Sequence, residues 1–259
     1  MGENVTREFP AKALLTGLRS IGYSFSTAVA DIMDNSISAQ ATLIHVYSDP
    51  LVAAPYFCIL DNGCGMNSSE LDNAMLPGSD REGIIDSEKE LGRFGLGLKS
   101  ASLSQCRRFV VASKKYGKIR AMAFDLDLIE SENKLVLTIL EDEEIADLPH
   151  IAKLQAYDTG TLVIWTKFDK IEGLAKNFED SFRRLVADSK KHVELVFHRF
   201  YEDISIFYHD KRIEKRDPFL LDSIGRQQTG RTSRINVNDS EIVVVPYTLP
   251  YANSLTTAE

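Results

Sequence analysis

Cysteine is scarce in this chain of 259 residues, which contains only Cys58, Cys64 and Cys106. Their number is odd and no pair has C-x-x-C spacing, so the sequence predicts neither a disulfide framework nor a zinc site. The five histidines form no HExxH cluster, and we expect them to be surface or packing residues. A reducing cytoplasm is the compartment that fits this cysteine usage best.

Long apolar runs are also lacking. The longest reach about eight residues, whereas a helix that crosses a bilayer needs roughly 20. The N-terminus has no basic segment followed by an apolar one, so secretion is not expected. The net charge of −8 argues against a protein that coats nucleic acid by bulk electrostatics. Together these absences predict a soluble, cytoplasmic protein with no membrane partner.

The segment from Ser26 to Ala39 carries apolar residues at helical spacing and has a polar opposite face. On that polar face Asp31 and Asn35 project from one side, a turn apart. A carboxylate can orient or deprotonate a water, and an amide oxygen can hold Mg²⁺. A solvated helix face would show the same pattern, so this feature decides nothing by itself.

A second feature follows the strand-like run 56–60, which leads straight into a turn of sequence Asp-Asn-Gly-Cys-Gly-Met. Its first residue is Asp61. A carboxylate that ends a buried strand, beside the flexible Gly63 and Gly65, can accept the exocyclic amino group of a purine. An Asx turn that closes a hairpin is the alternative interpretation.

The third feature is a polar segment, 77–91, that has few apolar anchors and is predicted to be a mobile lid. It ends in G-x-x-G-x-G at 92–97, which has neither the Rossmann order nor the Walker A spacing. Glycines let backbone N–H groups approach an anion, and the positive end of the following helix favours phosphate. Lys99 can add a point charge there. A plain turn is the alternative.

Taken in chain order, these features strongly resemble the N, G1, G2 and G3 boxes of the GHKL ATPase superfamily, with Thr159-Gly160-Thr161 as the last box. That superfamily contains gyrase B subunits, the large heat-shock chaperones, sensor histidine kinases and MutL. The resemblance covers residues 10–170. Within it, Asp-Asn-Gly-Cys-Gly-Met and Val-Ala-Ser-Lys-Lys look most like the MORC branch and its bacterial relatives, which are close to MutL.

Carried over by position, the resemblance implies that Asn35 holds Mg²⁺, that Asp61 takes the adenine amino group, that Gly65 backs the adenine and that Thr161 supports it. The remaining implied nucleotide-binding residues are Gly63, Met66, Gly92, Gly95, Leu96, Gly97 and Lys99. Asp31 takes the place of the water-activating residue, where most relatives have the longer Glu. Because a displacement of about 1 Å in a catalytic group can cost on the order of 10²-fold in rate, slow hydrolysis is expected.

Helices followed by strands that are interrupted by a helix and a lid predict an α+β fold. The residue pattern predicts a capping box of Asn67 with Glu70, a helix over 178–201, and strands that include 119–128, Ile213 and 242–245. The resemblance implies the two-layer α/β sandwich of the Bergerat type. Residues 1–170 are expected to form the ATP-binding domain, with its lid at 77–97. Residues 171–259 are expected to form a connecting helix and the first part of a transducer domain. This domain is predicted to be truncated, because the chain stops soon after a strong strand.

The function implied by the resemblance is a magnesium-dependent, slowly hydrolysing ATPase that acts as a nucleotide-gated dimerisation switch. An ATP-dependent homodimer is the implied assembly, and DNA or DNA-processing proteins of restriction-type defence are the implied partners. Two alternatives stay open. One is a histidine-kinase-type phosphotransfer domain, although no histidine-bearing helical hairpin precedes the motifs. The other is a scaffold that binds nucleotide without hydrolysing it, which the short Asp31 side chain makes credible.

Overall fold

The computed structural model of the chain describes residues 15–17, 19, 20, 22–76, 97–172, 177–221, 229–237, 240–251, 253 and 255. The predicted lid, apart from Gly97, therefore lies outside the described residues. The chain divides into two compact units, Met1–Glu214 and Lys215–Glu259, and each is described by itself.

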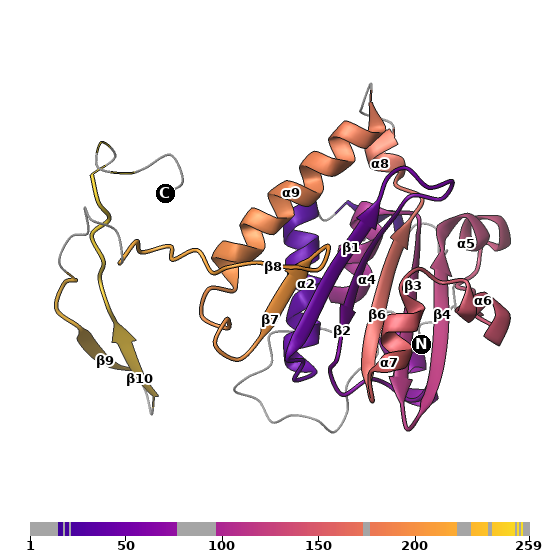
Figure 1. Cartoon of the computed structure of the whole chain (residues 1–259), viewed down its shortest axis with the longest axis horizontal. Coiled ribbons are helices and arrows are strands. Elements are labelled where there is room, and N and C mark those ends of the chain that lie inside the picture. Colours follow the sequence, from indigo (N-terminus) through magenta and orange to yellow (C-terminus); the bar gives the residue numbers. More distant parts are fainter. Residues whose placement is uncertain are drawn as a thin grey trace, which may run out of the picture. The chain divides into compact units, whose positions relative to one another are not determined.

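The first unit is built on an eight-stranded sheet with the strand order β5-β4-β3-β6-β2-β1-β7-β8 (Figure 1). Its strands are β1 (Leu43–Asp49), β2 (Tyr56–Asp61), β3 (Arg108–Lys115), β4 (Lys118–Asp125), β5 (Leu137–Ile139), β6 (Gly160–Thr166), β7 (Ser205–Tyr208) and β8 (Lys211–Arg212). Neighbouring strands are antiparallel except for β1 and β7, which are parallel. This mixed sheet with its helices confirms the predicted α+β sandwich.

Three helices cover one face of the sheet: α2 (Phe25–Ser38), α4 (Gly97–Gln105) and α9 (Phe178–Val196). The middle helix, α2, packs against both α4 and α9 (Figure 1). The ring of Phe25 lies 5.0 Å from that of Phe57 on β2 and 5.8 Å from that of Trp165 on β6, in edge contacts. Burying each such side chain contributes about 1.5–3 kcal/mol. These contacts fix α2 over the two strands that form the candidate site.

The opposite face carries a second, smaller apolar core. Residues Cys58, Leu60 and Leu162 of the sheet pack there with α6 (Asp142–Ala146) and α7 (Ile151–Ala156). Because side chains alternate along a strand, each central strand contributes to both cores. This two-sided burial explains the nearly continuous apolar runs of β2, β3 and β6, and it leaves only the strand ends for polar groups.

Several local predictions need correction or extension. The run 119–128 was expected to be one strand, but β4 ends at Asp125 and Leu126–Glu132 forms the helix α5. The reason is that the Asp125 carboxylate accepts the backbone N–H of Asp127 at 3.0 Å and caps the helix. The helix expected over 178–201 ends at Val196.

Other short elements complete the first unit. The predicted capping box of Asn67 and Glu70 is confirmed at the start of α3 (Ser68–Met75). The short helices α6, α7 and α8 (Asp169–Glu172) were not predicted. The strand-like Ile213 follows β8 and lies outside the sheet.

The second unit contains a hairpin of β9 (Ser233–Val237) and β10 (Ser240–Val244), and only β10 was predicted. The rings of Phe219 and Tyr247 stack in this unit with centroids 4.2 Å apart. Both α9 and β7 belong to the first unit. The boundary expected after residue 170 and the assignment of 171–259 to a transducer stay predictions.

Candidate functional site

The site centres on Asp61, the last residue of β2. Although Asp61 lies at a strand end, it is buried, with only 5% of its surface exposed. Its Oδ2 accepts the Ser36 hydroxyl of α2 at 2.8 Å, and its Oδ1 accepts the Gly63 backbone N–H at 2.9 Å. Burial raises the pKa of this carboxyl, and the hydrogen bonds from Gly63, Ser36 and the Thr161 backbone oppose that rise.

The backbone of the turn that begins at Asp61 is in close contact with the backbones of β3 and β6. Gly65 has a positive φ of +62°, and a Cβ there would lie 2.0 Å from the Lys114 carbonyl oxygen at the end of β3. A Cβ on Gly160 would lie 2.2 Å from the Asp61 carbonyl oxygen. The Thr159 hydroxyl donates to the Gly63 carbonyl oxygen at 2.7 Å. Only glycine fits at both positions, so the glycines of two distant motifs share one packing requirement.

Strand register brings three polar side chains into one row beside this turn. Asp61 pairs with Thr161 across β2 and β6, and Thr161 pairs with Ser113 across β6 and β3. Directly opposite residues of antiparallel strands point to the same face, which here is the face covered by α2. The Thr161 and Ser113 hydroxyl oxygens are 2.9 Å apart. The sheet therefore places Asp61 next to Thr161, although the two residues are far apart in sequence. Neither motif predicts this by itself.

The polar face of α2 lies at the same end of the molecule, because Ser36 of α2 contacts Asp61 directly. Asp31 is half-buried and Asn35 is exposed, and the Asn35 amide nitrogen donates to the Asp31 carbonyl oxygen at 2.9 Å. This assignment directs the amide nitrogen inward and leaves the amide oxygen as the group that can bind a cation. Burial, followed by a hydrogen bond to the Asp31 carboxylate, raises the pKa of Tyr23.

Asp34, one turn from Asp31, is a second acidic group on this face. Burial and then the negative charge of Asp31 raise its pKa to about 6. A carboxyl with such a pKa can take up or release a proton near neutral pH. The helix thus presents a second carboxyl group, Asp34, in addition to the Asp31 carboxylate expected from the motif.

The glycine-rich motif is described only at its end. Gly92, Gly95 and Leu96 lie outside the described residues, and Gly97 starts α4. Lys99 is buried, and its ammonium donates to the carbonyl oxygens of Ala74 (2.9 Å) and Leu76 (2.8 Å) at the end of α3. In this structure Lys99 therefore anchors α3 to α4, and its expected contact with phosphate stays a prediction.

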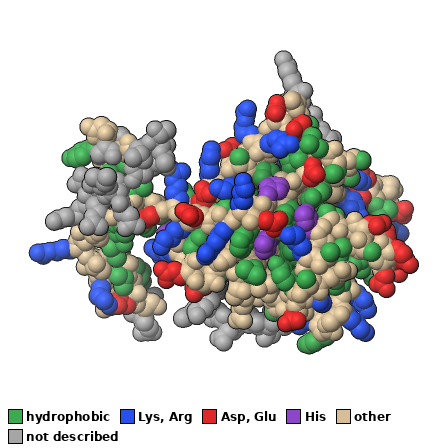
Figure 2. Space-filling model, in the orientation of Figure 1, with side chains coloured by type: hydrophobic (Ala, Val, Ile, Leu, Met, Phe, Trp, Pro, Cys, Tyr) green, Lys and Arg blue, Asp and Glu red, His purple; other side chains and the backbone are tan. Residues whose placement is uncertain are grey.

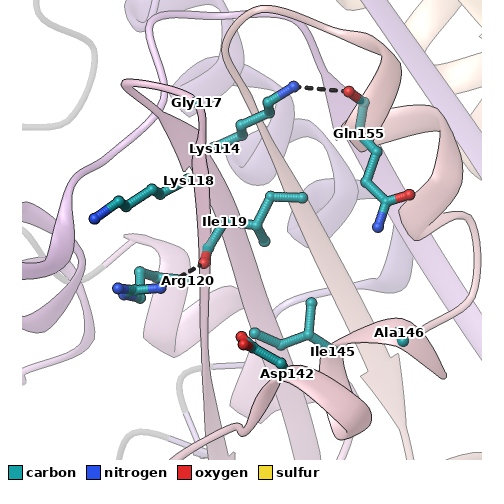
Figure 3. Close-up of a pocket in the computed structure, with 9 residues that line it drawn as sticks. All are labelled: Lys114, Gly117, Lys118, Ile119, Arg120, Asp142, Ile145, Ala146 and Gln155. Carbon is teal, nitrogen blue, oxygen red and sulfur yellow. Dashed lines mark hydrogen bonds between the residues drawn. The ribbon is translucent and has the colours of Figure 1, made fainter.

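A cleft of about 520 Å³ lies on the opposite face, between the β3–β4 turn and α6 (Figure 3). Its lining includes Ile119 and Ile145. Lys114 donates to the Gln155 carbonyl oxygen at 2.7 Å and so ties β3 to the end of α7 (Figure 3). None of the predicted site residues lines this cleft.

Histidines gather on the face seen in Figure 2. The His45 ring stacks on Phe207 at 4.6 Å, and the His150 ring stacks on Tyr47 at 3.9 Å. Burial, followed by the positive charge of Lys153, lowers the pKa of both histidines. They are packing residues, as predicted. Within the described part of the chain, no three His, Cys, Asp or Glu side chains form a ready-made metal site.

Comparison with known proteins identifies the fold family. Residues 23–161, which span the helix α2, the Asp61 turn and the start of β6, match the model described as histidine kinase-, DNA gyrase B- and HSP90-like ATPase. The chain belongs to this ATPase family. The expected GHKL membership is confirmed, and ATP is the ligand that membership supports.

Relatives of the ATPase domain include mouse ATPase MORC2B, 30% identical over 125 residues, or 47% of this chain and 11% of that protein. Human ATPase MORC2 is 29% identical over 125 residues, with the same shares. Human MORC family CW-type zinc finger protein 1 is 29% identical over 109 residues, or 41% of this chain and 11% of that protein. The matched segment therefore covers about a tenth of each relative. The domain is MORC-like, and its closeness to bacterial or MutL-type members stays a prediction.

Sequence reasoning missed three residues of the site. Ser36 follows Asn35 directly, and its contact with Asp61 could have been suspected from its place beside the motif. Ser113 ends an alternating apolar series, Phe109 and Val111, where a polar residue is unexpected. Asp34 lies on the polar side of the same predicted helix, but its raised pKa comes mainly from burial, which the sequence does not show. Of the helices in the described part, none is both long and apolar enough to cross a bilayer.

Proposed function

We propose that this domain binds ATP with its adenine against Asp61 and hydrolyses it slowly with Mg²⁺. The observation that carries the proposal is the set of hydrogen bonds that the Asp61 carboxylate accepts within the domain. A carboxylate has about four acceptor positions, and three internal donors use it here: Ser36, Gly63 and Thr161. About one position is left for a ligand, and a buried acceptor of this kind favours an amino group such as that of adenine.

The polar face of α2 supports the proposed hydrolysis. Asp31 would activate a water, and the outward amide oxygen of Asn35 would be a ligand of Mg²⁺, which prefers oxygen ligands. When bound, Mg²⁺ would neutralise negative charge on the phosphates. Gly63, Gly65 and Met66 would line the base pocket opposite Thr161.

The phosphates would lie near the start of α4. Backbone N–H groups of Gly92, Gly95, Leu96 and Gly97 would face the phosphate oxygens at this helix N-terminus, with Lys99 one turn further on. Closure of segment 77–97 over the nucleotide would complete the site. The structure describes only Gly97 and Lys99 of this set.

We propose further that ATP binding drives homodimerisation and that hydrolysis releases the dimer, in the service of DNA processing or restriction-type defence. Such a switch can shift its equilibrium only by the difference in ATP affinity between its open and closed states. This part of the proposal is based on the similarity of the domain to DNA gyrase B-like ATPases and to MORC2. A cytoplasmic location is proposed with it.

One rival function has a specific observation in its favour. The Tyr23 hydroxyl hydrogen-bonds to Asp31, and this contact competes with a water for the carboxylate. A domain in which that bond persisted would bind ATP as a structural ligand without hydrolysing it.

Calorimetric titration with ATP, with and without Mg²⁺, tests binding, and phosphate release measured on the same sample tests turnover. We expect saturable binding of one ATP per chain, tighter with Mg²⁺, and phosphate release that depends on Mg²⁺. Binding without any phosphate release would favour the structural-ligand function. Absence of ATP binding would contradict both.

A further inference from the structure

A cluster of ionisable side chains lies on the sheet face opposite to α2, apart from the residues proposed to bind nucleotide. At its centre is Tyr47 of β1, which is buried in the smaller apolar core. The other members come from β1, β2, α7 and the turn between β7 and β8. They are His45, Tyr56, His150, Lys153, His209 and Asp210.

The Tyr47 hydroxyl connects β1 to the β7–β8 turn. Its oxygen is 2.6 Å from Oδ1 of Asp210 and 3.0 Å from Nδ1 of His45. A carboxylate can only accept, so the single hydroxyl hydrogen goes to Asp210. Nδ1 of neutral His45 therefore carries a hydrogen and donates it to the Tyr47 oxygen. A second proton on this ring has to enter at the other nitrogen, Nε2.

The helix α7 is held on the sheet through the same tyrosine. The ring of His150, the residue before α7, stacks on the Tyr47 ring with centroids 3.9 Å apart, and its Nε2 is 3.1 Å from the Tyr56 hydroxyl. The Lys153 ammonium lies 4.9 Å from the centre of the Tyr47 ring and 3.0 Å from Oδ1 of Asp210. These contacts join α7 to β1 and to the β7–β8 turn at one point.

A single carboxylate balances the positive charges of this cluster. Hydrogen bonds from Tyr47 and then Lys153 lower the pKa of Asp210, so its carboxyl is ionised near neutral pH. Its charge is matched by Lys153 while the histidines are neutral. Protonation of His45 and His150 places two further positive charges beside Lys153, and His209, next to Asp210 in sequence, can add a third.

The surrounding charged groups do not restore this balance. Arg212 on β8 lies directly opposite Phe207, on which the His45 ring stacks, and so adds another positive charge. Asp49, at the end of β1, affects the pKa of Tyr56 but is not among the charges that shift the pKa of either histidine. The tyrosines nearby stay neutral because burial raises their pKa; they are Tyr47, Tyr56 and Tyr157.

We propose that this cluster is a proton-sensitive latch. It holds α7 and the β7–β8 turn on the sheet while His45 and His150 are neutral, and it releases them as these two histidines take up protons. The latch does not depend on bound nucleotide. Its release would reach the candidate site, because α7 leads to Thr159, whose hydroxyl donates to the Gly63 carbonyl oxygen.

The latch opens toward acid pH. Burial, followed by the positive charge of Lys153, lowers the pKa of both histidines from the ordinary 6.5. The released segments therefore bind protons more readily than the docked ones, so docking is stable above pH 6.5 and is lost as the pH falls below it. Between about pH 7.5 and 5.5 the opening equilibrium can rise by at most about tenfold for each histidine, or about 100-fold for both.

Hydrogen–deuterium exchange of the full chain at these two pH values, corrected for the intrinsic pH dependence of exchange, tests the latch. We expect acid to increase opening more in segments 150–156 and 209–213 than in β3 and β6. In the double variant His45→Gln/His150→Asn the increase should be much smaller, since neither new side chain titrates. Asn tolerates the positive φ of +61° at position 150.

His192→Gln is the matched control, because His192 lies on α9 and is not a member of the cluster. This variant should open with acid as the wild type does. Equal acid-induced opening in the wild type and in the double variant would overturn the latch, and so would an increase of the same size in β3 and β6. If the double variant does not fold, proton NMR titration of the wild-type histidines decides. Midpoints below 6.5 for His45 and His150 support the latch, and midpoints at or above 6.5 overturn it.

Discussion

Replacing Asp61 by Asn exchanges one carboxylate oxygen for an amide NH₂ group in the central side chain of the site. The carboxylate is surrounded by donors, since Ser36, Gly63 and Thr161 all direct hydrogens at it. The Ser36 hydroxyl can rotate to accept the new amide N–H, so the Asn oxygen can still accept from Gly63 and the domain should fold. The acceptor available to adenine is then reduced or lost. A hydrogen bond to a charged group contributes about 1.5–3 kcal/mol, which predicts an ATP affinity about 10- to 150-fold lower.

Calorimetric titration of Asp61→Asn with ATP and with inosine triphosphate measures this effect. The amide N–H of Asn can donate to the carbonyl oxygen of hypoxanthine, so we expect inosine triphosphate to lose less affinity than ATP. Asp147→Asn, which changes an exposed carboxylate next to α6, is the control and should match the wild type. Unchanged ATP affinity in a folded Asp61→Asn variant would refute the reasoning.

Three further predictions concern the α2 face and the lid. Asp31→Ala should keep ATP affinity while phosphate release falls about 10²- to 10⁴-fold, the usual contribution of a general base, and retained turnover in a phosphate-release assay would remove Asp31 from that role. Protease cleavage within 77–97 should slow when a nonhydrolysable ATP analogue and Mg²⁺ are added; equal cleavage with and without nucleotide would exclude lid closure. Asp34→Asn should stabilise the domain in a pH-dependent way, measured by urea unfolding. Because the folded-state pKa of about 6 exceeds the ordinary 3.8, ionisation of Asp34 opposes folding, so the gain should grow as pH rises from 3.8 to about 6 and then level off. A gain that is the same at pH 4 and pH 7 would argue against this titration.

Features set by nearby residues were predictable from the sequence. The apolar spacing of α2 and the Asn67 capping box follow from local geometry, and both are confirmed. The Asp61 turn was predictable for the same reason, since an acidic residue followed by glycines after an apolar run has few other conformations. The pattern failed over 126–128, where alternating Leu residues indicated a strand and the Asp125 cap starts a helix instead.

Features set by strand order were not predictable. The place of β6 between β2 and β3 brings Ser113 next to Thr161, and no local pattern encodes this order. Lys99 illustrates the same limit. Its position after a glycine-rich motif gave no sign that α3 ends beside it and supplies two carbonyl oxygens to its ammonium, and its contact with phosphate stays a prediction. Such contacts depend on which elements meet in the fold.

The most direct test of the account is a crystal structure of this chain with Mg²⁺ and a nonhydrolysable ATP analogue. We predict that the adenine amino nitrogen lies within about 3.2 Å of the Asp61 carboxylate, with Thr161 beside the base. A base bound elsewhere, for example in the cleft between Ile119 and Ile145, would contradict it.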